Sequence, residues 1–217
     1  MAILGLHTAG TGCDVAIVSD SGDILSRQER QMSRGQDAAL PRLLESALEE
    51  AGIDLRTISK IAVVVGPGSF TGIRLTTAFG RGLAISLKCP CVGVTSLEAC
   101  LPDGQQGSAM VVLPAKRREP DITFWTQSFR SGEATAAPEE TSRADLLDRL
   151  NAHPHMLYGS TEAGLTAPDH LVVHAARPSA VNAAKRVADK RFETRPARPV
   201  YVRPPDADLP GQKTKSC

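Results

Sequence analysis

The stretch VVVGPGSFTGIR, residues 63–74, holds the residue types best suited to binding chemistry. A glycine turn between a buried strand and a helix can bind an anion, because free backbone N–H groups and the positive end of the helix dipole point toward it. The stretch lacks the lysine of a P-loop and the spacing of a dinucleotide fingerprint. The alternative is structural: the glycines permit a sharp turn, and Ser69 or Thr71 caps the helix. The residues alone favour the structural interpretation and leave both open.

Two other spacings could serve a metal ion. His170 and His174 lie four residues apart, which on a helix would place both rings on one face. The intervening Leu-Val-Val favours a strand, on which the two rings lie about 13 Å apart and cannot share one ion. The pair Cys89 and Cys91 has no second ligand pair nearby, and five irregularly spaced cysteines fit a reducing cytoplasm better than a disulfide framework. We therefore expect no metal site in this chain.

The composition is that of a soluble globular protein of one large or two small domains, with 217 residues and a net charge of +1. The sequence has no apolar run of the roughly 20 residues that a membrane span needs, and its N-terminus does not resemble a secretory signal. We expect a cytoplasmic protein. Residues 177–217 carry ten Lys or Arg against four Asp or Glu, an excess that could contact a polyanion.

The elements that position the glycine turn follow from hydrophobic periodicity. The patterns predict strands at 2–6, 13–19, 22–30, 60–66 and 91–95, helices at 37–51 and 70–88, and the start of another helix at 96–100. A three-strand antiparallel meander followed by helix-linked strands predicts a mixed sheet with helices packed on it. This is the arrangement of ribonuclease-H-like domains.

The polar stretch LPDGQQG, residues 101–107, is the best candidate domain boundary. Beyond it the patterns predict strands at 109–117, 121–129, 155–159 and 170–175, helices at 141–150 and 178–191, and a proline-rich extended tail at 195–210 that lies on the surface. The order repeats the first half in reduced form. We therefore predict a first domain at 1–104 and a degenerate second copy at 105–217.

Residues 63–99 resemble the TsaB family of glycoprotease-like proteins, and the closing PVYVRPPDA resembles the C-terminal stretch of that family. The resemblance covers residues 2–100 well and the remainder only at its strands and tail. The family motif is carried here by Gly66, Pro67, Gly68, Ser69, Phe70, Thr71, Gly72 and Arg74. The resemblance implies an α/β actin-like (ASKHA) fold with two ribonuclease-H-like lobes, in which the glycine loop turns the chain.

The same resemblance implies a non-catalytic scaffold in the complex that forms N6-threonylcarbamoyladenosine at position 37 of tRNAs reading codons that start with A. The implied partners are the catalytic subunit TsaD, in a heterodimer, and the ATPase TsaE; tRNA is contacted through the complex, and the isolated chain could form a homodimer. ATP and metal ions are expected only on the partner subunits, so no cofactor is expected in this chain.

Two departures from the family pattern bear on catalysis. The first-strand turn usually has Asp-Thr-Ser in the family but begins with His7 here, and the second-lobe strand, often Asp-Ala-Arg, begins with Pro114. Both changes remove an acid that could hold a Mg²⁺-nucleotide. They argue against the alternative of an independent actin-like ATPase. The other alternative is a metal-dependent, glycoprotease-like hydrolase.

The two predicted helices of the first half carry the candidate partner-binding surface. Small residues let helix backbones approach closely, which offsets the ~1 kcal/mol that each helical glycine costs. The resemblance places them in a helical interface with TsaD or a second copy. The candidate interface residues are Leu40, Leu43, Leu44, Ala47, Thr76, Thr77, Gly80 and Leu83.

Overall fold

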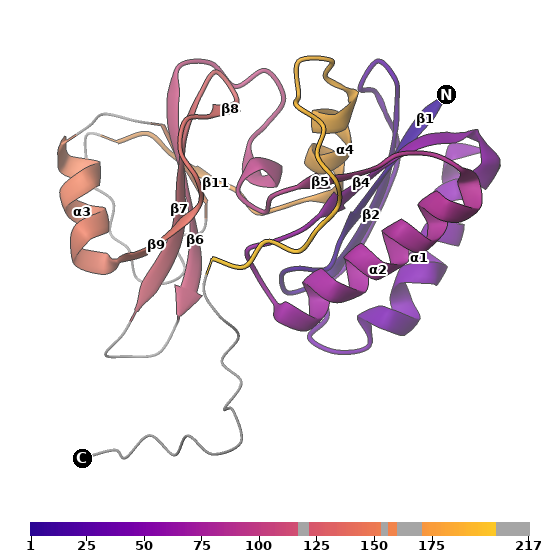
Figure 1. Cartoon of the computed structure of the whole chain (residues 1–217), viewed down its shortest axis with the longest axis horizontal. Helices are drawn as coiled ribbons and strands as arrows, with labels where there is room; N and C mark the ends of the chain where they lie inside the picture. Colours follow the sequence, from indigo (N-terminus) through magenta and orange to yellow (C-terminus); the bar gives the residue numbers. More distant parts are fainter. Residues whose placement is uncertain (117–121, 153–155, 160–170, 203–217) are drawn as a thin grey trace, which may run out of the picture.

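The protein contains two β-sheets that lie beside one another, each with helices packed on it (Figure 1). The computed structural model describes residues 1–116, 122–152, 156–159 and 171–202. Within this part of the chain, no helix is both long and apolar enough to cross a membrane. The two mixed sheets confirm the predicted α/β class and the actin-like arrangement of two lobes.

The first sheet has five strands in the order β3-β2-β1-β4-β5. These are β1 (Ala2–His7), β2 (Cys13–Ser19), β3 (Ile24–Arg30), β4 (Ile58–Val64) and β5 (Cys91–Val94). β1, β2 and β3 form the predicted antiparallel meander, whereas β4 runs parallel to β1 and β5 parallel to β4. The meander with its two added parallel strands is the ribonuclease-H-like order predicted from the sequence.

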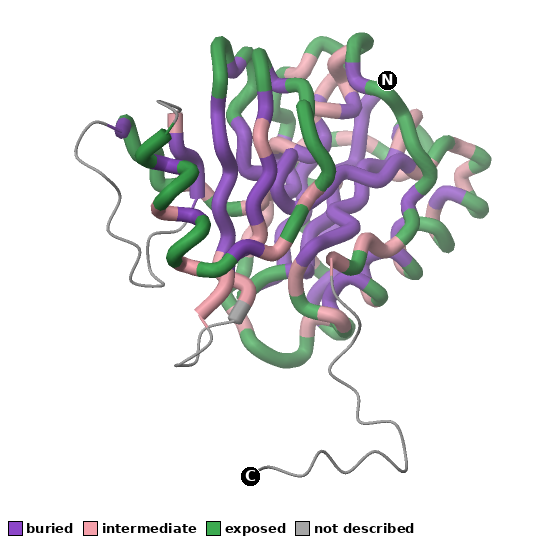
Figure 2. Tube along the Cα trace, turned by 60° about the vertical axis from the view of Figure 1, so that its left-hand side comes forward, coloured by how far each residue is buried: buried purple, intermediate pink, exposed green. Residues whose placement is uncertain are grey.

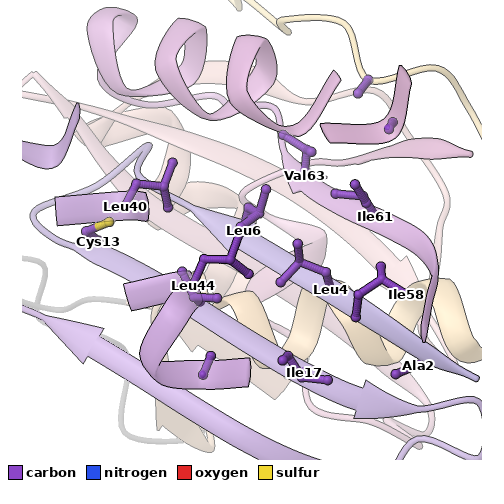
Figure 3. Packing of buried hydrophobic residues seen from close by; sticks show 14 of the residues in the cluster. Ala2, Leu4, Leu6, Cys13, Ile17, Leu40, Leu44, Ile58, Ile61 and Val63 are labelled. Carbon is purple, nitrogen blue, oxygen red and sulfur yellow. The ribbon is translucent and has the colours of Figure 1, made fainter. Parts of the chain in front are cut away.

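Helices α1 (Gln36–Ala51) and α2 (Phe70–Leu87) cover one face of this sheet. Their apolar side chains pack against the inward-facing residues of β1, β2 and β4, as Figure 3 shows for Leu40 and Leu44 beside Leu4, Leu6 and Ile17. α1 ends at Gly52, whose left-handed φ of 64° suits glycine. The short 3-10 turn η1 (Leu55–Thr57) then leads into β4. This face therefore forms the main core of the first lobe.

The opposite face is covered by α4 (Ala180–Ala188), which comes from the end of the chain. Ala183, Ala184 and Val187 are buried against β1 and β4. A Cβ atom at Gly5 of β1 would lie 2.1 Å from the carbonyl oxygen of Ala180, so only glycine admits the helix so closely. The helix predicted to start at residue 96 is only a 3-10 turn, η2 (Glu98–Cys100), and this prediction was wrong. α4 supplies the missing layer.

The second sheet repeats the order of the first in reduced form. Its order is β11-β10-β6-β7-β8, with β9 pairing to β7; the strands are β6 (Ser108–Lys116), β7 (Thr123–Arg130), β8 (Glu133–Ala134), β9 (Glu139–Ser142), β10 (Met156–Gly159) and β11 (Val173–Ala175). β6 and β7 form an antiparallel pair, and β10 and β11 add in parallel beside β6. α3 (Arg143–Ala152) buries Leu146 and Leu150 against this sheet. The division at 104/105 stays a prediction, because α4 crosses back to the first sheet.

The segment that follows α4 runs along β5 instead of lying free on the surface. Val92 and Pro196 form an isolated antiparallel bridge, and the amide of Gly93 donates to the carbonyl of Arg195 at 2.9 Å. Ala197 is buried. Figure 2 shows the buried strands of both sheets and the exposed turns of the helices. The tail is thus extended as predicted, but its first residues pack on the core instead of lying on the surface. Residues 203–210 of the predicted tail lie outside the described part.

Candidate functional site

The glycine loop after β4 packs directly on the turn that follows β1. A Cβ atom at Gly68 would lie 2.3 Å from the carbonyl oxygen of Ala9, and one at Gly72 would lie 1.9 Å from that of Thr8. The amide of Ser69 donates to Ala9 at 2.7 Å, and Ser69 caps α2 by accepting from the amide of Gly72 at 3.3 Å. These glycines are therefore accounted for by close contact between two backbone segments. No bound anion is needed to explain them.

A cleft of about 910 Å³ opens between the two lobes at this loop. Its first-lobe wall includes His7, Asp14 and Ser69, and its second-lobe wall includes Pro114 and Trp125. The indole nitrogen of Trp125 and the hydroxyl of Ser96, another lining residue, are buried and find no hydrogen-bond partner among the described residues. His7 and Pro114, the two positions at which this sequence departs from the pattern of the family it resembles, thus face one cavity.

The floor of the cleft holds a histidine that stays neutral. Burial and, to a smaller extent, the nearby Arg177 cation lower the pKa of His7 to about 4, opposed by the charge of Glu29. The Nδ1 atom of His7 accepts a hydrogen bond from the amide of Ala9 at 3.4 Å, which places the ring proton on Nε2. At neutral pH the residue therefore adds no charge to the cleft.

Beside His7 lie two carboxylates that hold the crossing between the lobes. Burial and the charge of Glu29 raise the pKa of Asp14 to about 6, opposed by Arg177, Arg27 and the backbone amide of Ala180. Glu29 forms ion pairs with Arg177 and Arg27. Glu29 thus binds the segment between β11 and α4 through Arg177, and Asp14 binds the first residue of α4. The four charged side chains balance one another, so the floor offers no excess positive charge to a polyphosphate.

This cluster was not predicted from the sequence. A signal was present, because Asp14 interrupts an otherwise apolar buried strand, but its neighbours come from β3 and from residue 177. The register pairs His7 with Asp14 and Asp14 with Glu29 across three adjacent strands. Only the strand order brings these residues together.

Within the described ranges, no group of three or more His, Cys, Asp or Glu side chains could hold a metal ion. His170 lies outside those ranges, and His174 on β11 stacks on Tyr158 with ring centroids 4.8 Å apart. Cys89 and Cys91 are half-buried free thiols, and burial raises the pKa of Cys91 to about 11. Both therefore stay protonated near neutral pH.

The candidate helical interface requires a correction. Six of its eight residues are buried in the chain's own core, and Leu43 and Leu83 are half-buried: the six are Leu40, Leu44, Ala47, Thr76, Thr77 and Gly80. A Cβ atom at Gly80 would lie 2.5 Å from Cγ2 of Val63, so this glycine admits the helix to β4 rather than to a partner. The six buried residues are therefore not exposed to a partner, because helical spacing does not say which surface a small residue faces. A contact of Leu43 and Leu83 with another protein stays a prediction.

The exposed faces of the same helices carry different residues. α2 exposes Arg74, Ala78, Arg81 and Ile85, which recur at helical spacing along one side. Ile85 is 79% exposed. α1 exposes a mostly acidic face, formed by Asp37, Glu45, Glu49 and Glu50. The exposed face of α1 is therefore mainly acidic, whereas the exposed face of α2 carries arginines and apolar contact area.

Two arginines of the basic stretch that could contact a polyanion already form ion pairs within the chain. Arg191 pairs with Asp189. Arg195 pairs with the nearly buried carboxylate of Glu98, which also accepts from the amide and hydroxyl of Thr95 at 2.7 and 2.9 Å. Arg198 is exposed. The Arg195–Glu98 pair anchors the C-terminal segment to the first lobe, and both pairs neutralise part of the basic excess.

The chain is similar in sequence to several known proteins. Residues 28–119 match the family described as TsaD, tRNA N6-adenosine threonylcarbamoyltransferase. TsaB of Buchnera aphidicola from Schizaphis graminum is 33% identical over 149 residues, covering 68% of this chain and 70% of that protein. TsaB of Escherichia coli is 30% identical over 142 residues, covering 65% of this chain and 61% of that protein.

An uncharacterised Mycobacterium tuberculosis protein is 32% identical over 168 residues, covering 75% of this chain and 72% of that protein. The solved structure of YeaZ from Pseudomonas aeruginosa superposes with a TM-score of 0.73, at 24% identity, covering 92% of this chain and 99% of that one. The structural likeness extends the shared fold over both lobes. The sequence relatives show that the chain belongs to the TsaB family.

Proposed function

We propose that this chain is a non-catalytic scaffold subunit in the biosynthesis of tRNA N6-threonylcarbamoyladenosine at position 37. TsaB relatives that are named for this biosynthesis support the proposal. The match of residues 28–119 to the TsaD family supports a pairing in which two related lobes meet through equivalent surfaces. In this proposal TsaD transfers the threonylcarbamoyl group, and TsaE hydrolyses ATP.

The observation that carries the scaffold assignment is the neutral His7 at the floor of the interlobe cleft. An actin-like ATPase needs acids at this turn and across the cleft to hold a Mg²⁺-nucleotide. Here the facing positions are His7 and Pro114, and Asp14 is the one carboxylate among the described residues that line the cleft. Asp14 accepts from the backbone amide of Ala180. It is therefore committed to the chain's own structure.

The exposed faces of α1 and α2 are the surface that we assign to TsaD. On α2, Ile85 and Ala78 give apolar contact area beside Arg81. Interfaces of this kind bury a small apolar centre within a charged rim. The acidic side of α1 and Arg81 of α2 would fix the orientation of a partner with the complementary charges.

Reconstitution tests the function. The purified chain is combined with TsaD, TsaE, tRNA, ATP and the threonylcarbamoyl donor, and the modified nucleoside is measured by mass spectrometry after digestion of the tRNA. We expect product only when the chain and TsaD are both present, and none with the chain alone. Product formed by the chain without TsaD would refute the scaffold assignment.

A matched pair of variants tests the surface. Ile85→Asp should weaken TsaD binding at least about tenfold, because it places a charge in the apolar centre, a loss of about 1.4 kcal/mol. Ile24→Asp makes the same change at another exposed isoleucine, 53% exposed on β3, and should leave binding unchanged. Surface plasmon resonance with immobilised TsaD measures both. Equal effects of the two variants would show that the helical face is not the contact.

A further inference from the structure

Three side chains form a stack at the exposed start of α2. The Arg74 guanidinium lies 3.7 Å above the centre of the Phe70 ring, and the Phe70 and Tyr201 ring centroids are 5.2 Å apart. Nε of Arg74 donates to the Tyr201 hydroxyl at 3.3 Å. We call these three residues the aromatic stack.

The stack is held rigidly although it lies at the surface. The amide of Val200 donates to the carbonyl of Val65 at 2.8 Å, which fixes the backbone immediately before Tyr201 beside the glycine loop. Tyr201 nevertheless remains 42% exposed. A ring that is fixed yet open to solvent can accept a planar ligand at a low cost in conformational entropy.

The charge at this place is not compensated within the described part of the chain. α2 contains no Asp or Glu in its sequence, and Arg74 forms no ion pair with a described carboxylate. Arg27, Arg177, Arg191 and Arg195, by contrast, all pair with acids. The Arg74 charge is therefore available to a ligand.

We propose that the aromatic stack is a contact for single-stranded RNA, in which an unpaired base stacks on Tyr201 and Arg74 binds the adjacent phosphate. The proposal rests on the proposed function, because it gives the scaffold its own contact with tRNA. Exposed aromatic rings joined to an arginine are the elements that bind unpaired nucleotides. A protein partner would favour a larger apolar surface than one partly exposed ring.

Fluorescence anisotropy with the purified full chain tests the proposal. The probes are a labelled 12-nucleotide oligo(rA) and a duplex RNA of the same length, each titrated at several salt concentrations. We expect tighter binding of the single strand. Tyr201→Leu should weaken it about 5- to 150-fold with an unchanged salt slope, as expected for the loss of one stacked base.

Arg74→Gln should lower the salt slope by about 0.7, the value for one phosphate contact on a single strand. Arg81→Gln, at an exposed arginine two turns along the same helix, is the control and should leave the slope unchanged. Circular dichroism establishes that each variant is folded.

Three results would overturn the proposal: no binding of the single strand at about 100 µM chain, the weak end of non-specific affinities; equal slopes for the Arg74 and Arg81 variants; or unchanged affinity of folded Tyr201→Leu. Loss of TsaD binding by Tyr201→Leu with RNA binding intact would assign the stack to the protein partner and overturn it too. The reconstitution with the unmodified chain is independent of these outcomes, so the proposed function can stand when this contact fails.

Discussion

Replacing Gly80 by alanine should destabilise the chain, whereas the same replacement at Gly82 on the same helix should stabilise it. A Cβ atom at Gly80 would lie 2.5 Å from Cγ2 of Val63, but one at Gly82 would meet nothing within 4 Å. Alanine gains about 1 kcal/mol over glycine inside a helix. Overpacking at a tight site costs about 1–3 kcal/mol.

The net change in the free energy of unfolding follows from these two effects. At Gly80 they sum to a loss of between about 0 and 2 kcal/mol, and at Gly82 only the gain of up to about 1 kcal/mol remains. The two variants should thus differ by about 1–3 kcal/mol, and in urea, where m is about 1–3 kcal/mol per molar, their midpoints should separate by roughly 0.3–3 M. Equilibrium unfolding followed by circular dichroism measures both.

A double variant isolates the contact. Val63→Ala removes the methyl group that the new Cβ would strike, so Gly80→Ala should become stabilising in the Val63→Ala background. Equal stabilisation by Gly80→Ala and Gly82→Ala in the native background would refute the assignment of Gly80 to the chain's own core. The interface would then have to be reconsidered.

Three further predictions concern the cleft, the crossover helix and the C-terminal segment. Between pH 4 and 6.5 the unfolded chain binds more protons at His7, so stability rises with pH; between pH 3.8 and 6 the folded chain binds more at Asp14, so stability falls with pH. Over pH 4–6 the two effects nearly cancel in the native chain, so Asp14→Asn should leave a rise in stability with pH and His7→Asn a fall, each on the order of 2–3 kcal/mol. Urea midpoints that change with pH in parallel in the two variants would contradict this. A chain ending at residue 178 lacks α4 and should aggregate, whereas a soluble monomer with native circular dichroism would show that the first sheet needs no second layer. Arg195→Gln leaves the carboxylate of Glu98 buried without its cation, so it should lower the free energy of unfolding by about 1–3 kcal/mol. It should also speed hydrogen exchange at the amide of Gly93, and an unchanged exchange rate would contradict this prediction.

Local patterns were enough to predict the first lobe. The strands, α1 and α2 follow from the periods of their apolar residues, and Gly52 and Ser69 mark a helix end and a helix start by local geometry. The predicted helix at 96 was wrong because its few residues are also consistent with a single 3-10 turn. The placement of α4 on the first sheet could not be predicted, since no local feature says which of two sheets a small-residue helix will cover.

The site shows the same limit. The sequence distinguished the glycine loop from a P-loop, and its structural role agrees with the close approach of Gly68 and Gly72 to the first turn. Thr77, predicted to lie in the interface with a partner, is only 4% exposed, because a threonine on the inner side of α2 has the same spacing as one on the outer side. The pairing of Glu29 with Arg177 joins residues far apart in the chain and has no local signal.

The return of α4 to the first sheet has a consequence for synthesis on the ribosome. β5 ends at Val94 and α4 begins at Ala180, so at about 5–20 residues per second the ribosome needs roughly 4–17 s to deliver the covering helix. During that interval the apolar side chains of Ile3, Ala62 and Val64 are not covered by α4. A nascent chain in this state is a substrate for chaperones that bind exposed strands, and its yield in the cell should depend on their supply more than on the stability of the finished protein.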